Sequence, residues 1–356
     1  MTRTQFILVP SAHPTGPVKG AYAIANALVA RKKTILVFLK RGPGVDAFLD
    51  DRVIKVFLDE YGTSFTRKLN AYKALLIEEG GRSRVDSLSL CFSADIVNLF
   101  CRKQAVIYSS VRGNLFQNYR YDYGRKGLFL AVVHLVSLSH FDEVVAMTNV
   151  MARQIKRVTR RMPKVIGNFV DEQSIEPYRV TPRSIGKTTR FVFVGSLSKR
   201  KRPELVLEAM VFLDKQKFEL DILGDGPEFG ALKKLIYQNG LQRNVRLHGH
   251  LSNPLPIVAG SDVFVLPSNS EGVSRAAIEA LYLGIPCVLR NVDGNRSLLS
   301  EPESGAVFDQ DSDLLSAMLD SVQMARRRIK RESLLPQCFR ESHAVFNYVA
   351  LLGGDS

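Results

Sequence analysis

The chain has 356 residues, of which 46% are hydrophobic and 24% charged, as in an ordinary soluble globular protein. This length predicts two domains, because single hydrophobic cores stop growing at about 250–300 residues. Its longest apolar run, Gly127–Phe141, has 15 residues, fewer than the roughly 20 that a membrane span needs. Its four cysteines form no CxxC pair, as expected of a reduced cytosolic protein. The formal net charge of +14 belongs to the first half, where residues 1–170 hold 26 Lys and Arg against 12 Asp and Glu.

The first half alternates predicted strands and helices. A short apolar strand opens it, too short to be the core of a signal peptide, and a Gly/Pro loop (residues 11–20) follows. Such alternation predicts parallel βαβ units in a doubly wound sheet. The predicted strands are 5–10, 34–39, 85–90, 105–110, 143–148 and 164–170, and the predicted helices are 21–32, 94–102, 128–138 and 150–159.

Residues 171–189 carry two prolines and a glycine with little periodicity, so we place the domain boundary there. The pattern then restarts, which predicts a second sheet of the same kind. The predicted strands are 190–196, 218–223, 244–251, 262–268 and 286–292, and the predicted helices are 204–213, 231–240, 254–261, 275–283 and 311–330. The tail is predicted to form an amphipathic helix. We therefore expect domains at 1–170 and 171–335, with residues 336–356 packing back toward the first domain.

Two carboxylates eight positions apart, Glu271 and Glu279, lie where a predicted strand is followed by a helix. Gly272 lets the backbone approach a ligand, and Ser274 is placed to cap a helix that begins at Arg275. The free N–H groups of this helix start would face a phosphate, while the carboxylates would accept hydrogen bonds from vicinal hydroxyls. Two such glutamates can also be plain surface residues, but the combination suits a nucleotide-sugar.

The second domain opens with a strand that ends at Gly195, a basic run, Lys199–Arg202, and a helix expected to begin at Pro203. A helix N-terminus beside Lys or Arg is a ready anion site, although the run alone could be a solvated cluster of charges. The next strand ends in a glycine-rich turn, Gly224–Gly230, whose spacing is not that of a dinucleotide motif. We interpret it as a tight turn near a nucleotide base, with purely structural glycines as the alternative.

Four motifs occur in a fixed order: GSLSKRKRPELVLEA, LGDGPE, VRLHGHL and SNSEGVSRAAIEALYLGIPCV. In that order the chain resembles glycosyltransferase family four, strongly over residues 164–310 and weakly before them. KVIGNFVDE resembles the interdomain segment of that family. The resemblance implies an α/β GT-B fold, with two Rossmann-like doubly wound parallel-sheet domains facing across a cleft. It also implies a retaining enzyme whose first, basic domain binds the acceptor and whose second domain binds the nucleotide sugar.

The resemblance further implies roles for individual residues. Glu271 would contact hydroxyls of the donor sugar, Glu279 would hold the ribose, and Lys201 would stabilise the diphosphate. Lys201 and Glu271 are thus the expected catalytic residues. Gly16, in the first loop, would approach the phosphate. The other donor-site candidates are Gly195, Ser196, Gly224, Gly272, Val273, Ser274 and Arg275.

Two features of the family pattern are missing. Ser196 stands where the family often has an arginine, so the second phosphate cation is open, with Arg200 or Arg202 as possible substitutes. The acceptor-side histidine of many relatives is also absent, and Arg112 lies near its position. The acceptor-side candidates are therefore His13, Arg112 and Asn114.

The expected chemistry needs no metal. Cleavage of the anomeric C–O bond leaves negative charge on the β-phosphate, which Lys201 and a helix N-terminus would stabilise. The D-x-D sequence Asp311–Asp313 is interpreted as a helix start. No side chain is an obvious nucleophile, so we favour same-face attack by the acceptor, with covalent attack by a side chain as the open alternative. The co-substrate is a nucleotide diphosphate sugar, with UDP favoured by family frequency, and no cofactor is expected.

The basic first half could face nucleic acid, an anionic membrane, an anionic substrate or plain solvent. No nucleic-acid motif accompanies the charge, so we expect no nucleic-acid partner. Residues 113–135 mix aromatic and basic residues with an apolar helix, and residues 153–164 hold six basic residues and no acid. Such a surface can lie on an anionic membrane, with a core helix and a solvated basic face as the alternative. We expect a cytoplasmic protein, peripheral at the inner face of the cell membrane.

The predicted function is transfer of a sugar to a glycan or lipid-linked glycan in cell-surface polysaccharide or lipopolysaccharide synthesis. One alternative is a nucleotide-sugar epimerase on the same frame, which would need no acceptor. A second is a non-catalytic basic module that binds membranes or nucleic acid. The intact Glu271 and Glu279 pair argues against loss of the site, and donor binding would distinguish the alternatives.

Overall fold

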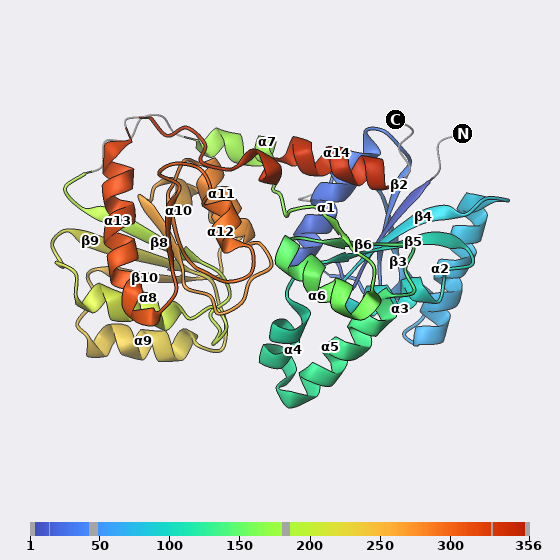
Figure 1. Ribbon diagram of the computed structural model, residues 1–356, viewed down its shortest axis with the longest axis horizontal. Helices are drawn as coiled ribbons and strands as arrows, with labels where there is room; N and C mark the ends of the chain where they lie inside the picture. Colours follow the sequence, from blue (N-terminus) through green and yellow to red (C-terminus); the bar gives the residue numbers. More distant parts are fainter. Residues whose placement is uncertain (1–3, 14, 43–48, 180–185, 329, 353–356) are drawn as a thin grey trace. The chain divides into compact units, whose positions relative to one another are not determined.

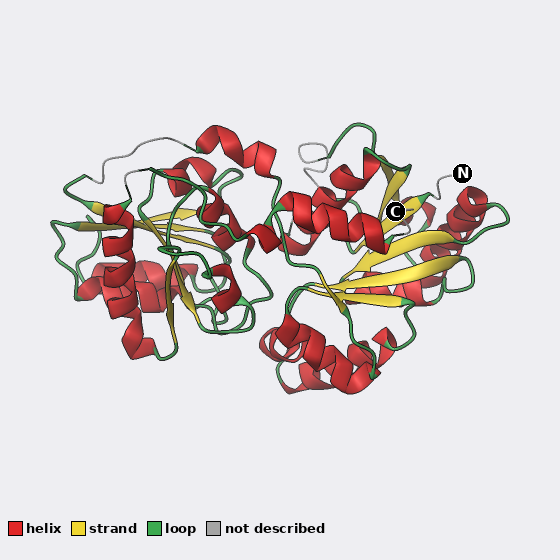
Figure 2. Cartoon of the chain, turned by 45° about the horizontal axis from the view of Figure 1, so that its top comes forward, coloured by secondary structure: helices red, strands yellow, loops and turns green. Residues whose placement is uncertain are grey.

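The computed structural model describes residues 4–13, 15–42, 49–179, 186–328 and 330–352. The chain forms two compact units (Figure 1): unit 1 comprises Met1–Phe169 with Glu341–Ser356, and unit 2 comprises Val170–Arg340. The chain leaves unit 1 one residue before the boundary expected from the sequence and returns to it after Arg340. In each unit, strands of one sheet lie between helices (Figure 2).

Within the described residues, unit 1 holds a seven-stranded sheet in the order β3-β2-β1-β4-β5-β6-β7, with every neighbouring pair parallel. The strands are β1 (Gln5–Val9), β2 (Thr34–Phe38), β3 (Ile54–Phe57), β4 (Val85–Leu90), β5 (Ala105–Val111), β6 (Glu143–Ala146) and β7 (Lys164–Val165). Strand order reverses between β1 and β4, which is the switch point where doubly wound sheets bind ligands.

The helices of unit 1 connect these strands. They are α1 (Gly16–Val29), the 3-10 turn η1 (Leu58–Tyr61), α2 (Phe65–Gly80), α3 (Phe92–Leu99), α4 (Leu115–Tyr123), α5 (Arg125–Leu138), α6 (Asn149–Thr159) and α14 (Glu341–Leu351). β3, η1 and α2 were not predicted from the sequence, and only the second half of the α4–α5 pair was. Gly124, at φ 61°, separates these two helices, in a conformation that glycine adopts without strain.

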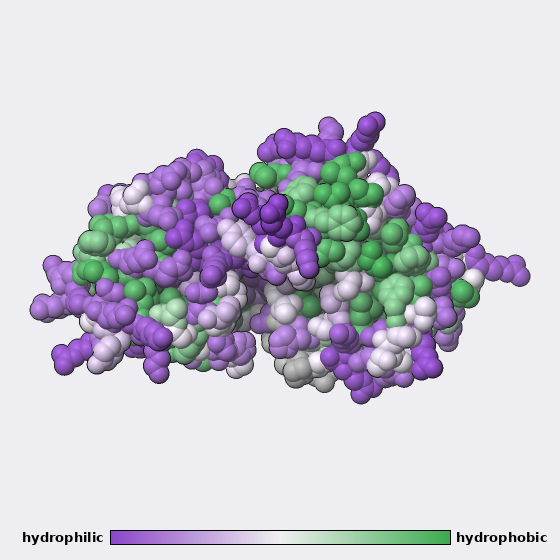
Figure 3. Space-filling view, turned by 90° about the horizontal axis from the view of Figure 1, so that it is seen from below, coloured by the Kyte–Doolittle hydropathy of each residue, from purple (hydrophilic) through white to green (hydrophobic). Residues whose placement is uncertain are grey.

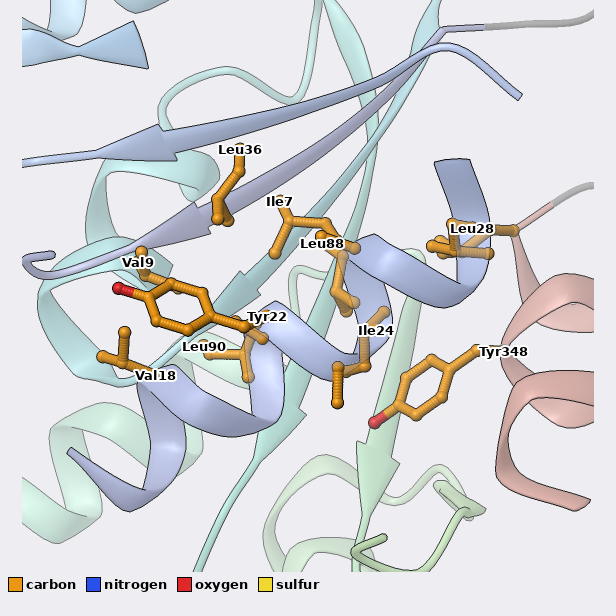
Figure 4. Close-up of a cluster of buried hydrophobic side chains, with 14 of the residues drawn as sticks. Ile7, Val9, Val18, Tyr22, Ile24, Leu28, Leu36, Leu88, Leu90 and Tyr348 are labelled. Atoms are coloured by element: carbon orange, nitrogen blue, oxygen red, sulfur yellow. The ribbon is translucent and has the colours of Figure 1, made fainter. Parts of the chain in front are cut away.

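The core of unit 1 lies between its sheet and the helices α1 and α14. Tyr348 of α14 is buried, and its hydroxyl lies 3.1 Å from Ser110 Oγ of β5. Gln5 of β1 donates to the carbonyl of Leu352, just after α14. The chain end therefore packs on the first unit, although α14 begins at Glu341, and residues 353–356 of the predicted tail lie outside the described residues. Figure 4 labels part of this core, namely Ile7, Val9, Val18, Tyr22, Ile24, Leu28, Leu36, Leu88, Leu90 and Tyr348.

Unit 2 repeats the same strand order, β10-β9-β8-β11-β12-β13, again with parallel pairs over the described residues. The strands are β8 (Thr189–Val194), β9 (Phe218–Leu223), β10 (Val245–Gly249), β11 (Val263–Leu266), β12 (Cys287–Arg290) and β13 (Gly305–Phe308). The edge strand β13 was not predicted. The reversal of order falls between β8 and β11, so the loops after these two strands border the crevice of this sheet.

The helical elements of unit 2 begin right after the boundary. They are α7 (Glu172–Ile175), η2 (Glu176–Tyr178), α8 (Pro203–Val211), α9 (Phe229–Gln238), α10 (Leu255–Ala259), α11 (Arg275–Tyr282), α12 (Asn295–Leu298), η3 (Asp311–Asp313), α13 (Leu314–Arg327) and η4 (Gln337–Phe339). Helix α8 begins at Pro203, as predicted. Among the helices of the described residues, none is both long enough and apolar enough to cross a membrane.

Candidate functional site

The loops that follow β8 and β11 are bonded to each other at the switch point of unit 2. The backbone N–H of Asn269 donates to the carbonyl of Arg200 at 2.8 Å. In return, the guanidinium of Arg200 donates to the carbonyl of Ser270 at 2.9 Å. These bonds fix the basic run after β8 against the segment that carries Glu271, although the two segments are 70 positions apart in sequence.

Lys201 and Glu271 form an ion pair at this junction, with side chains that are 13% and 7% exposed. Burial alone would raise the pKa of Glu271, but the charges of Lys201 and Arg200 hold that pKa below its ordinary value. The carboxylate is therefore charged at neutral pH. Its own backbone N–H donates to Asp293 at 3.1 Å, so both ends of Glu271 are fixed.

Helix α11 starts directly behind this pair. The hydroxyl of Ser274 accepts a hydrogen bond from the N–H of Ala277 at 3.3 Å, which confirms the predicted N-cap. The first-turn N–H groups of α11 therefore lie at the same loop as Glu271, where the helix dipole favours an anion. Gly272, Val273 and Ser274 are buried, so their contribution to a ligand would come from the backbone.

Glu279 lies one turn into α11 and is half-buried. If it holds the ribose of the donor, Glu279→Ala will raise the KM for the donor about tenfold or more and leave kcat nearly unchanged, because a contact equal in ground and transition states affects binding alone. Steady-state kinetics with varied donor measures both constants. Glu208→Ala, at an exposed position on α8, is the matched control. A fall in kcat at unchanged KM would contradict the assignment.

Gly224 follows β9 and packs against Gly195, which follows β8. Gly224 has φ 145°, and a Cβ at this position would overlap the carbonyl oxygen of Gly195. A Cβ on Gly226 would likewise overlap the carbonyl oxygen of Leu197. The first two glycines of the turn are therefore explained by close contact between two loop backbones, whereas a Cβ on Gly230 would meet nothing within 4 Å.

The two candidate substitutes for the missing arginine are both engaged within the protein. Arg202 donates to Glu204 at 3.0 Å and to Asp311 at 2.9 Å, and Arg200 holds the carbonyl described above. Asp311 also accepts from Arg290, whose side chain lies under the loop after β11. Ser196 is exposed in the loop after β8. The geometry thus brings Lys201, rather than Arg202, to Glu271.

The predicted D-x-D sequence, Asp311–Asp313, forms the short 3-10 turn η3 in front of α13. Asp313 and Gln310 form a reciprocal capping box, which confirms the predicted helix start. In the described part of the chain, this turn included, no cluster of three or more His, Cys, Asp or Glu side chains has the arrangement of a metal site.

The remaining candidates lie in unit 1, after β1 and β5. Gly16 is the first residue of α1, and His13 is exposed just before it. Arg112 follows β5 and donates to Asn168, and its guanidinium lies where a Cβ on residue 20 would be. Asn114 caps α4 by accepting from the N–H of Gln117. The structure explains Arg112 and Asn114 by local contacts, and their roles toward an acceptor stay predictions.

Asp293 is a residue of the site that was not predicted from the sequence. It follows β12, has φ 48°, and receives hydrogen bonds from the N–H of Glu271 and the hydroxyl of Ser270. Its only signal in the sequence is the turn-forming pair Asp293-Gly294 after a predicted strand. That signal predicts a turn, but the contact with residue 271 depends on the neighbouring positions of β11 and β12 in the sheet.

Comparison with known proteins agrees with this geometry. Residues 174–332 match the family model described as Glycosyl transferases group 1. The matched residues, which all lie in unit 2, are therefore similar to that family. Lys201, Glu271 and helix α11 all lie within the matched residues.

Two curated relatives come from bacteria. The UDP-Gal:alpha-D-GlcNAc-diphosphoundecaprenol alpha-1,3-galactosyltransferase of Escherichia coli is 34% identical over 158 residues, covering 41% of each chain. The N-acetyl-alpha-D-glucosaminyl L-malate synthase of Bacillus anthracis is 27% identical over 200 residues, covering 52% of each. This chain spans between 25% and 56% of the length of the first relatives that it matches.

Solved structures match the whole chain. The crystal structure of Anabaena Alr3699/HepE in complex with UDP and glucose has a TM-score of 0.79 at 17% identity, covering 99% of this chain and 100% of the other. A sucrose-phosphate synthase from Thermosynechococcus elongatus also has a TM-score of 0.79, at 16% identity and 98% coverage of both chains. The chain has the α/β GT-B fold, with two Rossmann-like units, and this prediction is confirmed.

Proposed function

We propose that the chain is a glycosyltransferase that moves a hexosyl group from a nucleotide diphosphate sugar to a glycan or lipid-linked glycan. The observation that carries the proposal is the Lys201–Glu271 pair beside the N-terminus of α11, inside the matched family domain. A cation and a helix start bind a diphosphate, and a fixed carboxylate accepts from sugar hydroxyls. These are the parts of a nucleotide sugar.

The pair also supports a mechanism. Charge develops on the β-phosphate as the anomeric bond breaks, and a fixed ammonium with a helix dipole stabilises it without reorganisation. An ammonium has three donor hydrogens, so the contact with Glu271 orients Lys201 and leaves donors for a phosphate. In this proposal the transfer retains anomeric configuration and needs neither a metal nor a cofactor. One relative named for UDP-Gal and solved structures in complex with UDP support UDP as the nucleotide.

We further infer that the acceptor belongs to cell-surface polysaccharide or lipopolysaccharide synthesis at the inner face of the cell membrane. Support comes from the names of the relatives, which include an O-antigen biosynthesis glycosyltransferase and a lipopolysaccharide core biosynthesis glycosyltransferase. The acceptor named for the galactosyltransferase is linked to diphosphoundecaprenol, a lipid. A cytoplasmic enzyme that meets both a soluble donor and a lipid acceptor fits this setting.

A melting screen against nucleoside diphosphates and their sugars tests the proposal. UDP or a UDP-hexose at 100 times its Kd will stabilise the protein by about 2.7 kcal/mol, which raises Tm by roughly 5–10 °C for a domain of this size. Glu271→Gln in the same screen locates the effect at the site. If no nucleoside diphosphate raises Tm, the proposal fails. If a donor binds but is converted without an acceptor, the chain is an epimerase.

A further inference from the structure

Helix α5 has apolar side chains on both its faces. Its inner face is buried, and its outer face is exposed to solvent, with exposed fractions of 37–71%. The residues of the outer face are Leu128, Phe129, Val132, Val133 and Val136. They recur at spacings of three and four, so they form one continuous stripe. Figure 3, viewed from the side on which α4 and α5 lie in Figure 1, shows a wide apolar area there.

The stripe is held facing outward by a polar network on the inner side of α5. His134 Nε2 lies 2.7 Å from Asp95 Oδ2 of α3, and His134 Nδ1 lies 3.0 Å from the hydroxyl of Tyr119 on α4. Asp95 also accepts from Ser89 of β4 at 2.6 Å. His134 and Asp95 are almost fully buried. Rotation of α5 to hide its stripe would break these bonds, so the exposure is a built feature of the hairpin.

Positive charge surrounds the stripe. Helix α6, which packs against α5, has a strongly basic outer face, and no residue of either helix is acidic. Residues 112–164 hold ten Lys and Arg against three Asp and Glu. The exposed basic residues on α4, α5 and α6 are Arg120, Arg125, Lys126, Arg153, Lys156 and Arg157. An apolar stripe with a basic rim is the pattern of a helix that lies in the surface of an anionic bilayer.

We propose that the α4–α5 hairpin and α6 form a docking surface for an anionic lipid bilayer. The α5 stripe enters the boundary between headgroups and acyl chains, and the basic residues of α6 bind the lipid phosphates. A second copy of the chain is a less suitable partner for this surface, because a two-fold interface would place two basic rims against each other. The inference rests on the proposed function in one respect, since a lipid-linked acceptor would lie in the same bilayer.

Vesicle co-sedimentation of the full chain tests the stripe. The wild-type protein will bind vesicles of phosphatidylcholine that contain about 30% phosphatidylglycerol. It will bind vesicles of phosphatidylcholine alone far less, because each basic residue near an anionic surface adds attraction. The double variant Phe129→Gln/Val133→Gln will bind at least tenfold more weakly. Phe346→Gln is the control, since Phe346 on α14 is as exposed as Phe129, at 69% against 71%, and lies on another element.

A second pair of variants tests the basic rim. Lys156→Gln/Arg157→Gln on α6 will weaken binding to the anionic vesicles about tenfold and remove most of its salt dependence. The control is Arg102→Gln/Lys103→Gln, two adjacent exposed basic residues of unit 1 that lie after α3. Equal binding of all variants, or equal binding of wild type to both kinds of vesicle, would overturn the proposal.

Two measurements separate this inference from other outcomes. Sedimentation velocity without lipid detects a dimer, and a dimer that Phe129→Gln/Val133→Gln dissolves would assign the stripe to a second copy instead. Donor-induced melting shifts will be the same in the docking variants as in wild type, because the substituted residues lie on α5 and α6 and none of them is a donor-site candidate. If a docking variant loses vesicle binding but keeps the melting shift caused by the donor, the change concerns docking alone. If no variant and no wild-type protein shows that melting shift, the proposed function fails, whatever the result with vesicles.

Discussion

Replacing Lys201 with alanine will lower kcat by about 10²–10³-fold, the usual effect of removing one preorganised donor from a developing charge. The ammonium of Lys201 lies at the Glu271 carboxylate and beside the loop that starts α11. No other basic side chain of that run is so placed, among the residues that the structure describes, since Arg200 and Arg202 are bonded elsewhere. Single-turnover measurement of transfer from a UDP-hexose gives the chemical step directly.

The neighbouring residue supplies the control. Lys199 belongs to the same basic run but is exposed, so Lys199→Ala will change kcat less than twofold. A similar loss in both variants would mean that the run acts by its general charge. Wild-type kcat in Lys201→Ala would remove Lys201 from the catalytic site.

Lys201→Ala also leaves the buried Glu271 carboxylate without its ion-pair partner, which destabilises a protein by up to about 3–5 kcal/mol. The double variant Lys201→Met/Glu271→Gln removes both charges and will regain most of that stability. Turnover will not return, because the donor to the phosphate is still missing. Melting curves and kcat of the two variants therefore separate the structural effect of the pair from its catalytic effect.

Elements with strong local signals could be predicted from the sequence. The buried strand Gln5–Val9 contains the continuous apolar run Phe6–Val9, and Ser274 stands directly in front of a helix, so both followed from neighbouring residues. The edge strands Ile54–Phe57 and Gly305–Phe308 were missed because each is only four residues long and partly exposed, which leaves a short, mixed sequence pattern. Local sequence patterns therefore predict the secondary structure of a segment well, but they predict poorly which distant residues that segment contacts.

The same limit explains the site. The carboxylates and the lysine could be selected from motifs, because the residues of each motif are adjacent in sequence. Their partners could not, since Asp293 lies 22 residues from Glu271, and Asp311 lies 109 residues from Arg202. Only the order of strands in the sheet brings these residues together. The sequence alone shows that serine replaces the family arginine at position 196. It does not show that Arg202 is already paired with Asp311.

Gly224→Ala is expected to destabilise the protein by about 3–5 kcal/mol and to abolish the melting shift caused by the donor. The backbone at φ 145° strains any residue with a Cβ, and that Cβ would overlap the carbonyl oxygen of Gly195. The loops after β8 and β9 would have to separate, and the loop after β8 carries Lys201. Thermal melting with and without UDP measures both effects.

Gly230 of the same motif provides the matched control for this substitution. It lies in the first turn of α9, and a Cβ there meets nothing within 4 Å, so Gly230→Ala will stabilise the protein by about 0.5 kcal/mol and leave the donor shift intact. If the two alanine variants have the same stability and the same donor-induced melting shift, close contact between the loop backbones is not the reason for the glycines. An unchanged donor shift in Gly224→Ala, despite lower stability, would separate the packing of these loops from the binding of the diphosphate.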